Sequence, residues 1–254
     1  MSRTALSFLS PFADLRCVTG PGVCFIHTIV DKIPFGVYDF FAYLSSGTVM
    51  LVALDQVSRT GLLTQPHITP ALAVVLVIAA YVVGHIVAHF SSFLLEHRFC
   101  GKLLYRPTTL LLGSAPHFVF LSKLFPNYHR ALPASTRIRI REQAASRGFT
   151  AHGEALFLHA YALVTANEKA QARLDEFRNQ YGFARNMSFA FIVSGLMLTI
   201  ARYFGDSLSW MFILLVFGAG IALLYRYLKF FRQYSCELFL RYAELPKETQ
   251  TKGE

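Results

Sequence analysis

Four long apolar runs divide the chain, and shorter polar segments separate them. The longest run, Ile68–Leu95, contains no Lys, Arg, Asp or Glu, and it exceeds the about 20 apolar residues that a helix needs to cross a bilayer. The other runs are Gly36–Leu54, Phe183–Tyr203 and Leu208–Leu228. The pattern predicts an all-α polytopic membrane protein with four transmembrane helices, surrounded by the lipid bilayer.

The positions of these runs predict five segments. They are a cytosolic N-terminal leader (1–33), a hairpin of spans 1 and 2 (34–95), a cytosolic helical domain (96–181), a hairpin of spans 3 and 4 with a cytosolic stalk (182–245) and a disordered tail (246–254). The composition agrees with a polytopic protein, because only 15% of the residues are charged, against about 25% in soluble domains.

Local signals predict helices within the segment between spans 2 and 3. The stretch Pro107–Phe125 is apolar but interrupted, so we expect it to pack inside the helical domain, and the alternative is a helix that lies on the membrane surface or re-enters it. Ser135 or Thr136 is expected to cap a following helix that Gly148 ends. A further helix is expected after Gly153.

The last two spans are expected to continue beyond the membrane as helices. Thr165–Glu168 fits a capping box, and no proline follows it until Pro246. We expect one helix over about Glu168–Tyr203 and a second over about Leu208–Leu245. The second carries a heptad-like apolar stripe that must be buried against its partner helix or another subunit. The stripe consists of Phe231, Leu238, Tyr242 and Leu245.

Basic residues are distributed unevenly between the two sides that four spans define. One side, with both termini and residues 96–181, holds 22 of the 24 Lys and Arg, and the other holds only Arg59 and Arg202. Because basic residues are retained in the cytoplasm, we expect this side, with both termini, to be cytoplasmic. The same rule accounts for the net charge of +9, so nucleic acid is not an expected partner.

Four arginines cluster in one short stretch of the predicted helical domain. They are Arg137, Arg139, Arg141 and Arg147. One interpretation is a solvated helix face. The other is contact with anionic lipid headgroups, which contributes about 1 kcal/mol for each basic residue near the surface.

Polar residues near the inner ends of three spans are candidates for one intramembrane cluster. They are Asp39, His85, His89, Arg185 and Asn186. A structural interpretation pairs Asp39 with His89 or Arg185 and fixes the bundle. A second is a permeation or proton pathway. A third is a metal ion on His85 and His89, although no H-E-x-x-H is present, and neither a metal nor a cofactor is predicted overall.

Three phrases open or follow the spans: YDFFAYL, YGFARNMSF and FFRQYSCELFLRYAEL. Through them, about residues 30–245 resemble a group of uncharacterised bacterial four-span inner-membrane proteins, a resemblance that implies no activity. Small multi-span proteins with a cytosolic domain also occur as membrane subunits of phage-defence systems, which is a hypothesis from architecture alone.

Three functions follow as ranked hypotheses. The first is a non-enzymatic subunit that self-associates as a homo-oligomer and couples to a cytosolic protein partner, as a pore, sensor or anchor. The second is a membrane-embedded metal-dependent enzyme that uses His85, His89 and Asp39. The third is a small transporter, which ranks last because the outer halves of the spans offer few polar groups.

Overall fold

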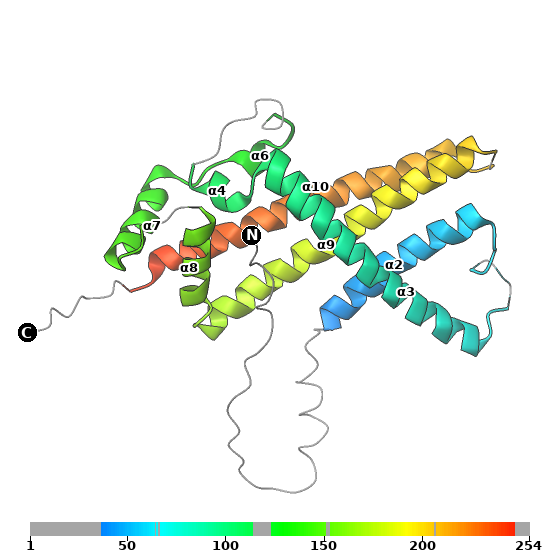
Figure 1. Ribbon diagram of the computed structural model, residues 1–254, viewed down its shortest axis with the longest axis horizontal. Coiled ribbons are helices and arrows are strands. Elements are labelled where there is room, and N and C mark those ends of the chain that lie inside the picture. The colour runs from blue at the N-terminus through cyan, green and yellow to red at the C-terminus, as the bar shows by residue number, and fades with distance from the viewer. Residues whose placement is uncertain are drawn as a thin grey trace, which may run out of the picture. The chain divides into compact units, whose positions relative to one another are not determined.

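The computed structural model describes residues 37–63, 65, 67–113, 123–150, 153–205 and 207–246. Every regular element in these residues is helical, as predicted (Figure 1). In chain order they are α2 (Val37–Ser58), α3 (Pro70–Ser91), the π-helix η1 (Ser92–Leu104), α4 (Pro107–Leu111), α6 (Pro126–His129), α7 (Ala134–Ser146), α8 (Glu154–Val164), α9 (Glu168–Tyr203) and α10 (Trp210–Glu244). The predicted leader, and the predicted tail beyond Pro246, lie outside the described residues.

Four of these helices are long and apolar enough to cross a membrane, as the sequence predicts. They are α2, α3 with its continuation, α9 and α10. Large apolar side chains cover their outer surfaces: Val75 on α3 is 59% exposed and Met211 on α10 is 73% exposed. Such apolar surfaces are stable in lipid, so the four helices identify the chain as a membrane protein.

The helices α2 and α3 approach each other very closely through small residues. A Cβ atom at Gly47 would overlap the backbone of Ala80, and one at Gly84 would overlap the backbone of Tyr43. Small residues allow this approach in lipid, where dispersion contacts replace the hydrophobic effect between helices. Gly47 on α2 and Gly84 on α3 are therefore the residues that set the short distance between these two helices.

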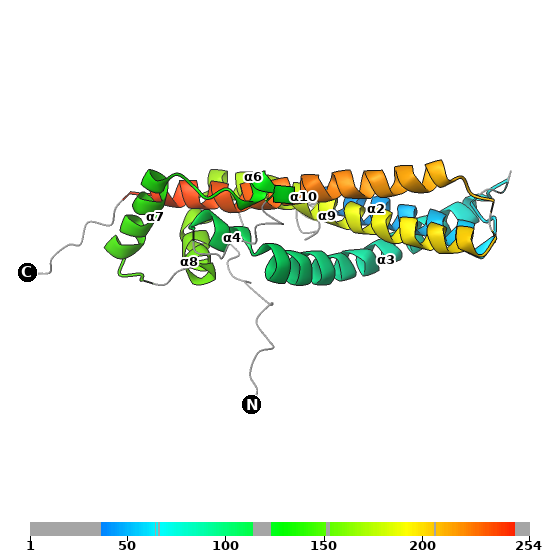
Figure 2. The ribbon, with the colours of Figure 1, turned by 90° about the horizontal axis from the view of Figure 1, so that it is seen from above.

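The helices α9 and α10 form an antiparallel pair that runs side by side in both views (Figures 1 and 2). Helix α9 begins at Glu168, passes Gly182 without interruption and ends at Tyr203, as predicted. With 36 residues it is about 54 Å long, whereas the hydrocarbon core is about 30 Å thick. Both helices therefore extend well beyond any span that they form.

The start of α9 is correct, but its predicted capping box does not form. The side chain of Asn167 caps the helix by accepting hydrogen bonds from two backbone N–H groups of the first turn, at 3.0 and 3.3 Å. The Thr165 hydroxyl instead donates to the carbonyl of Tyr161 in α8, at 2.7 Å. Asn is among the strongest N-cap residues, and it stands immediately before the helix, so it takes the position that was assigned to Thr165.

The predicted start of α7 is also wrong in its detail, whereas its end is correct. Ser135 and Thr136 lie inside the first turn, and no side chain caps the helix. At the other end Gly148 adopts a φ of +70°, and the N–H of Phe149 donates to the Ala144 carbonyl at 2.9 Å. These features form a Schellman motif, which requires a residue such as glycine in the left-handed conformation.

The stripe on α10 is buried within the chain itself. Phe231 is 9% exposed, and Leu238 and Tyr242 are completely buried. Leu174 of α9 joins the last two in one apolar cluster, so the partner helix covers part of the stripe, as predicted. Much of the remaining cover comes from α7 and α8, whose buried side chains belong to the same cluster, and Leu245 packs against its edge.

Candidate functional site

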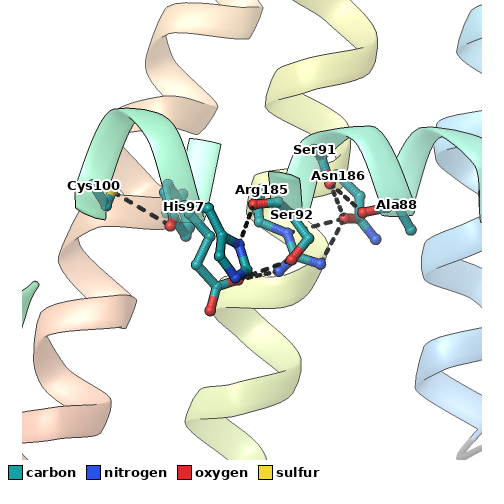
Figure 3. Close-up of polar contacts among 9 residues, drawn as sticks. Ala88, Ser91, Ser92, His97, Cys100, Arg185 and Asn186 are labelled. Atoms are coloured by element: carbon teal, nitrogen blue, oxygen red, sulfur yellow. Dashed lines mark hydrogen bonds and ion pairs between the residues drawn. The ribbon is translucent and has the colours of Figure 1, made fainter. Parts of the chain in front are cut away.

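A set of polar contacts joins the end of α3 and the start of η1 to α9 (Figure 3). The Arg185 guanidinium forms an ion pair with Glu96, with 2.5 Å between Nη1 and Oε2. It also donates to the Asn186 side-chain oxygen through Nε and Nη2, at 3.3 and 3.2 Å. The same oxygen accepts a hydrogen bond from the Ser91 hydroxyl at 2.7 Å. These four residues are called the polar junction below.

The polar junction is largely shielded and balanced in charge. Ser91 and Asn186 are buried, while the side chains of Arg185 and Glu96 are 14% and 26% exposed. Buried polar groups are stable only when their hydrogen bonds are satisfied, and here each of the four has a partner. The arrangement therefore fits a structural connection between α3, η1 and α9.

Two of the five predicted cluster residues, Arg185 and Asn186, belong to this junction, whereas Asp39 does not. No hydrogen bond or ion pair in the described residues joins Asp39 to His89 or to Arg185, whose acidic partner is Glu96. Asp39 lies in the first turn of α2 and is half-exposed. A carboxylate there is favoured by the helix dipole, so it needs no cationic partner.

The two predicted histidines do not converge on a common site. The His85 ring stacks on Tyr43 of α2, with ring centres 4.1 Å apart, and lies edge-on to Tyr81. His89 is exposed, and its ring contacts Phe90 of the same helix. Within the described residues, no group of three or more His, Cys, Asp and Glu is placed to hold a metal ion.

Beside the polar junction, a buried thiol contributes to packing. The Tyr227 hydroxyl lies 3.4 Å from the sulfur of Cys100, which is completely buried (Figure 3). Nearby, the Tyr128 hydroxyl donates to the Tyr105 carbonyl at 2.9 Å. Burial raises the pKa of Tyr128 well above its usual range, so this hydroxyl keeps its proton. A thiol without solvent access has a structural role here.

The four clustered arginines do not share one environment. Arg139 and Arg141 are exposed on α7, whereas Arg137 is half-buried. Arg147 donates to the carbonyl of Pro246 at 2.9 Å and so helps to hold α7 on the end of α10.

The helix that carries these arginines packs near Tyr242, close to the end of α10. This residue is 14 positions beyond Leu228, the predicted end of the fourth span, and therefore about 21 Å farther along the helix. Headgroup contact through the four arginines stays a prediction, and the position of α7 does not favour it.

Sequence reasoning missed Glu96 and Ser91, although a signal was present. Glu96 is the first charged residue after the longest apolar run, and Arg185 is the last one before the third span becomes apolar. Opposite charges at the same ends of two antiparallel spans are candidates for an ion pair.

Comparison of the chain with protein family models, with curated proteins and with solved structures found no match. The similarity to bacterial four-span proteins therefore remains a resemblance in three short phrases. The function proposed next depends on the geometry of the described residues.

Proposed function

We propose that this chain is a non-enzymatic membrane subunit of the anchor type, which holds a cytosolic helical domain at a fixed orientation to four spans. In this role the domain binds a cytosolic protein partner, and the spans fix the complex to a bacterial inner membrane. One observation carries the proposal: α9 and α10 run without a break from the apolar spans into the cluster that α7 and α8 complete.

The packing along α10 supports a rigid connection rather than a flexible one. Two apolar clusters follow one another on its inner half: the first includes Tyr227 and Phe231, and the second includes Leu238 and Tyr242. Gln143 of α7 also donates to the carbonyl of Leu245, at 3.0 Å. A helix that is packed at successive turns resists bending, so movement of the spans would displace the domain as a unit.

The apolar stripe on α10 no longer supports the expected self-association. The stripe on α10 was expected to need a partner helix or another subunit, and α7, α8 and α9 cover it inside one chain. Self-association therefore stays a prediction without a surface assigned to it in the described part of the chain. The phage-defence setting likewise stays a hypothesis from architecture.

The enzyme and transporter alternatives receive less support. A metal site on His85, His89 and Asp39 would require these side chains to converge, and they face different surroundings. A transport pathway would require free polar groups along several spans. The buried hydroxyls of Ser46 and Ser188 instead bond to the backbone carbonyls of Ala42 and Gly220. The buried hydroxyl of Ser194 has no partner in the described residues, but one such group on α9 does not form a pathway.

The first test concerns orientation, on which a cytosolic partner depends. In a variant without its native cysteines, single cysteines replace the exposed residues Gln65 and Ala145. An impermeant thiol reagent on intact cells should label position 65 and leave position 145 unlabelled until the cells are lysed. Labelling of position 145 alone on intact cells would place the domain outside and contradict the proposal.

The second test looks for the partner by photo-crosslinking in the native host. A photoreactive residue replaces Leu158 on α8, which is 61% exposed, and in a matched control it replaces Val75 on α3, which is 59% exposed. Position 158 should give one discrete protein adduct that position 75 does not give. An adduct at twice the chain mass of 28.6 kDa would instead indicate self-association through the domain. Identical results at both positions would contradict a partner-binding domain.

A further inference from the structure

A polar pocket lies beside η1, the π-helix that carries Glu96 of the polar junction. Its volume is about 360 Å³, which is within the usual range for small-ligand pockets. Residues from η1, α4 and α8 line it, and they include His97, Lys102, Tyr105, Arg106, Thr108 and Glu154. Most of these side chains are polar or charged, so the pocket suits a hydrophilic group.

The π-helix places the basic side chains of this pocket. In a π-helix, hydrogen bonds join residues five apart, so His97 and Lys102 come to lie on one side. Directly after it, Tyr105 adopts a φ of +63°, which a bulky residue rarely does, and the chain turns so that Arg106 also faces the pocket. The Tyr128 hydroxyl holds this turn through the Tyr105 carbonyl.

The charges in the pocket favour an anion. Arg106 forms an ion pair with Glu154, so these two charges compensate each other. Lys102 has no acidic partner in the described residues, which leaves an excess positive charge. Lys and Arg side chains together with hydroxyl groups are the usual ligands of a phosphate group in proteins.

A second and independent observation is the hydroxyl of Thr108. Thr108 lines the pocket and is 7% exposed, and its Oγ1 atom has no hydrogen-bond partner within the part of the chain that is described. A buried hydroxyl without a partner is unfavourable, and such groups are commonly satisfied by a bound ligand or by solvent. The hydroxyl itself has almost no accessible surface, so rotation of the Thr108 side chain would bring it to an acceptor bound in this pocket.

The pocket also lies close to the apolar surface of the spans. Phe93 and Leu94 on η1 are 48% and 42% exposed, and they end the apolar surface that continues from α3. His97 follows Leu94 by three residues, which is less than one turn of η1, so it lies next to the level where the apolar surface gives way to the headgroup layer. Lys102 lies farther out, and its long side chain can reach back toward the interface.

We propose that this pocket binds the phosphate group of an anionic ligand, which comes from either a lipid headgroup or a soluble phosphate ester. Lys102, Arg106 and the Thr108 hydroxyl hold the phosphate. The proposal does not depend on the coupling function above, because a chain with no cytosolic partner would keep the same pocket.

The experiment measures ligand-dependent thermal stability of the full-length protein in detergent, because a ligand that binds only the folded state raises Tm. Three probes are titrated: glycerol 3-phosphate, short-chain phosphatidylglycerol and short-chain diacylglycerol, which carries no phosphate. We expect the Tm to rise with at least one phosphate-bearing probe and not with diacylglycerol. A rise with phosphatidylglycerol alone identifies the lipid headgroup as the source, and a rise with glycerol 3-phosphate identifies a soluble ligand.

Three variants with opposite expectations assign the binding to the pocket. Lys102→Gln should weaken the apparent affinity about tenfold through loss of a charge-assisted hydrogen bond. Thr108→Val should weaken it as well, yet leave the Tm without ligand unchanged or higher, because it removes an unsatisfied hydroxyl. Glu154→Gln should tighten binding, because it releases Arg106 and removes the negative charge.

A control variant tests whether any basic residue has the same effect. Arg139→Gln and Arg141→Gln together remove two exposed charges from α7 and should leave the affinity unchanged. The proposal is overturned if no phosphate-bearing probe raises the Tm, or if this control weakens binding as much as Lys102→Gln does. It is also overturned if Thr108→Val raises the Tm without any change in affinity.

Discussion

The two halves of the α9–α10 pair are packed by different kinds of residue. In the half that belongs to the spans, most of the buried positions are small, namely Ser188, Ala190, Ser194, Gly195, Ala201 and Gly220. In the half beyond the spans, called the inner half, most of the buried positions are large, namely Leu174, Tyr227, Leu228, Phe231, Leu238, Phe239 and Tyr242, and the small exceptions are Ala184 and Ser235. The same two helices thus change their packing along their length.

The surrounding solvent explains this difference. Lipid is as apolar as a leucine side chain, so large residues gain little from contact between helices, and small ones allow the backbones to approach. In water the hydrophobic effect contributes about 25 cal/mol for each Å² of apolar surface buried, which favours large inward side chains. The change from small to large residues near Tyr227 therefore agrees with the predicted end of the fourth span at Leu228.

The largest expected effect is in the inner half, at Leu238. Leu238→Asp buries a carboxylate in the cluster of α7, α8 and α10, where Leu238 is completely buried. Unpaired buried charge is among the few changes that cost more than about 4 kcal/mol, so the helical domain should lose its fold. Limited proteolysis of the purified protein should then cleave this domain while the spans stay protected.

The control for this change is two residues away on the same helix. Leu240 is 37% exposed, so Leu240→Asp should alter stability by about 0.5 kcal/mol or less. Equal protease resistance of both variants would show that the inner half is not packed as described.

A smaller effect is expected in the half that belongs to the membrane, at Gly84. Gly84→Ala introduces a methyl group that would overlap the Tyr43 backbone, so α2 and α3 must move apart. Overpacking of this kind costs about 1–3 kcal/mol. The matched control is Gly218→Ala on α10, because a Cβ there meets no atom within 4 Å. The free energy of unfolding in mixed micelles should be lower for Gly84→Ala than for Gly218→Ala. Equal free energies would contradict close packing of α2 and α3 through small residues.

The polar junction, which lies where the two halves meet on α9, should contribute less to the free energy of unfolding. A double-mutant cycle of Glu96→Gln and Arg185→Gln is expected to give a coupling free energy of about 1 kcal/mol, as for a favourable, partly exposed ion pair. The same cycle on Asp39 and His89 should give no coupling, since these side chains do not meet. A coupling energy for Asp39 and His89 equal to that of Glu96 and Arg185 would reverse the assignment of partners.

Much of the fold follows from the sequence, because apolar runs and proline positions define long helices directly. The bounds of α9 were predicted at Glu168 and Tyr203, and α10 begins and ends within two residues of its prediction. These features depend on the local amino-acid composition alone, which can be read from a single sequence.

The candidate sites could be predicted only in part, because they depend on how helices are rotated against one another. Two of the predicted cluster residues, Arg185 and Asn186, do lie together, but Arg185 meets Glu96 rather than Asp39. The π-helix that carries Glu96 and Lys102 alters which residues share a face, and no local pattern predicted it. The sequence of α10 shows that its apolar stripe must be buried, but it does not show which helices bury it. The packing of α7 and α8 on Leu238 therefore could not be predicted from the stripe.

The smallest expected effect concerns Gly182, which lies on α9 where the two halves meet. If the halves form one rigid connection, this glycine has no conformational role, and its φ lies in the ordinary helical range within α9. A Cβ at Gly182 meets no atom within 4 Å, so Gly182→Ala should raise the free energy of unfolding by about 0.4–1 kcal/mol, chiefly by reducing the entropy of the unfolded chain. Thermal unfolding in detergent gives the sign directly. If Gly182 serves as a hinge, binding of the partner requires α9 to bend there. Gly182→Ala would then raise the stability but abolish crosslinking of the partner at position 158. If α9 is rigid, Gly182→Ala should raise the stability and leave crosslinking at position 158 unchanged.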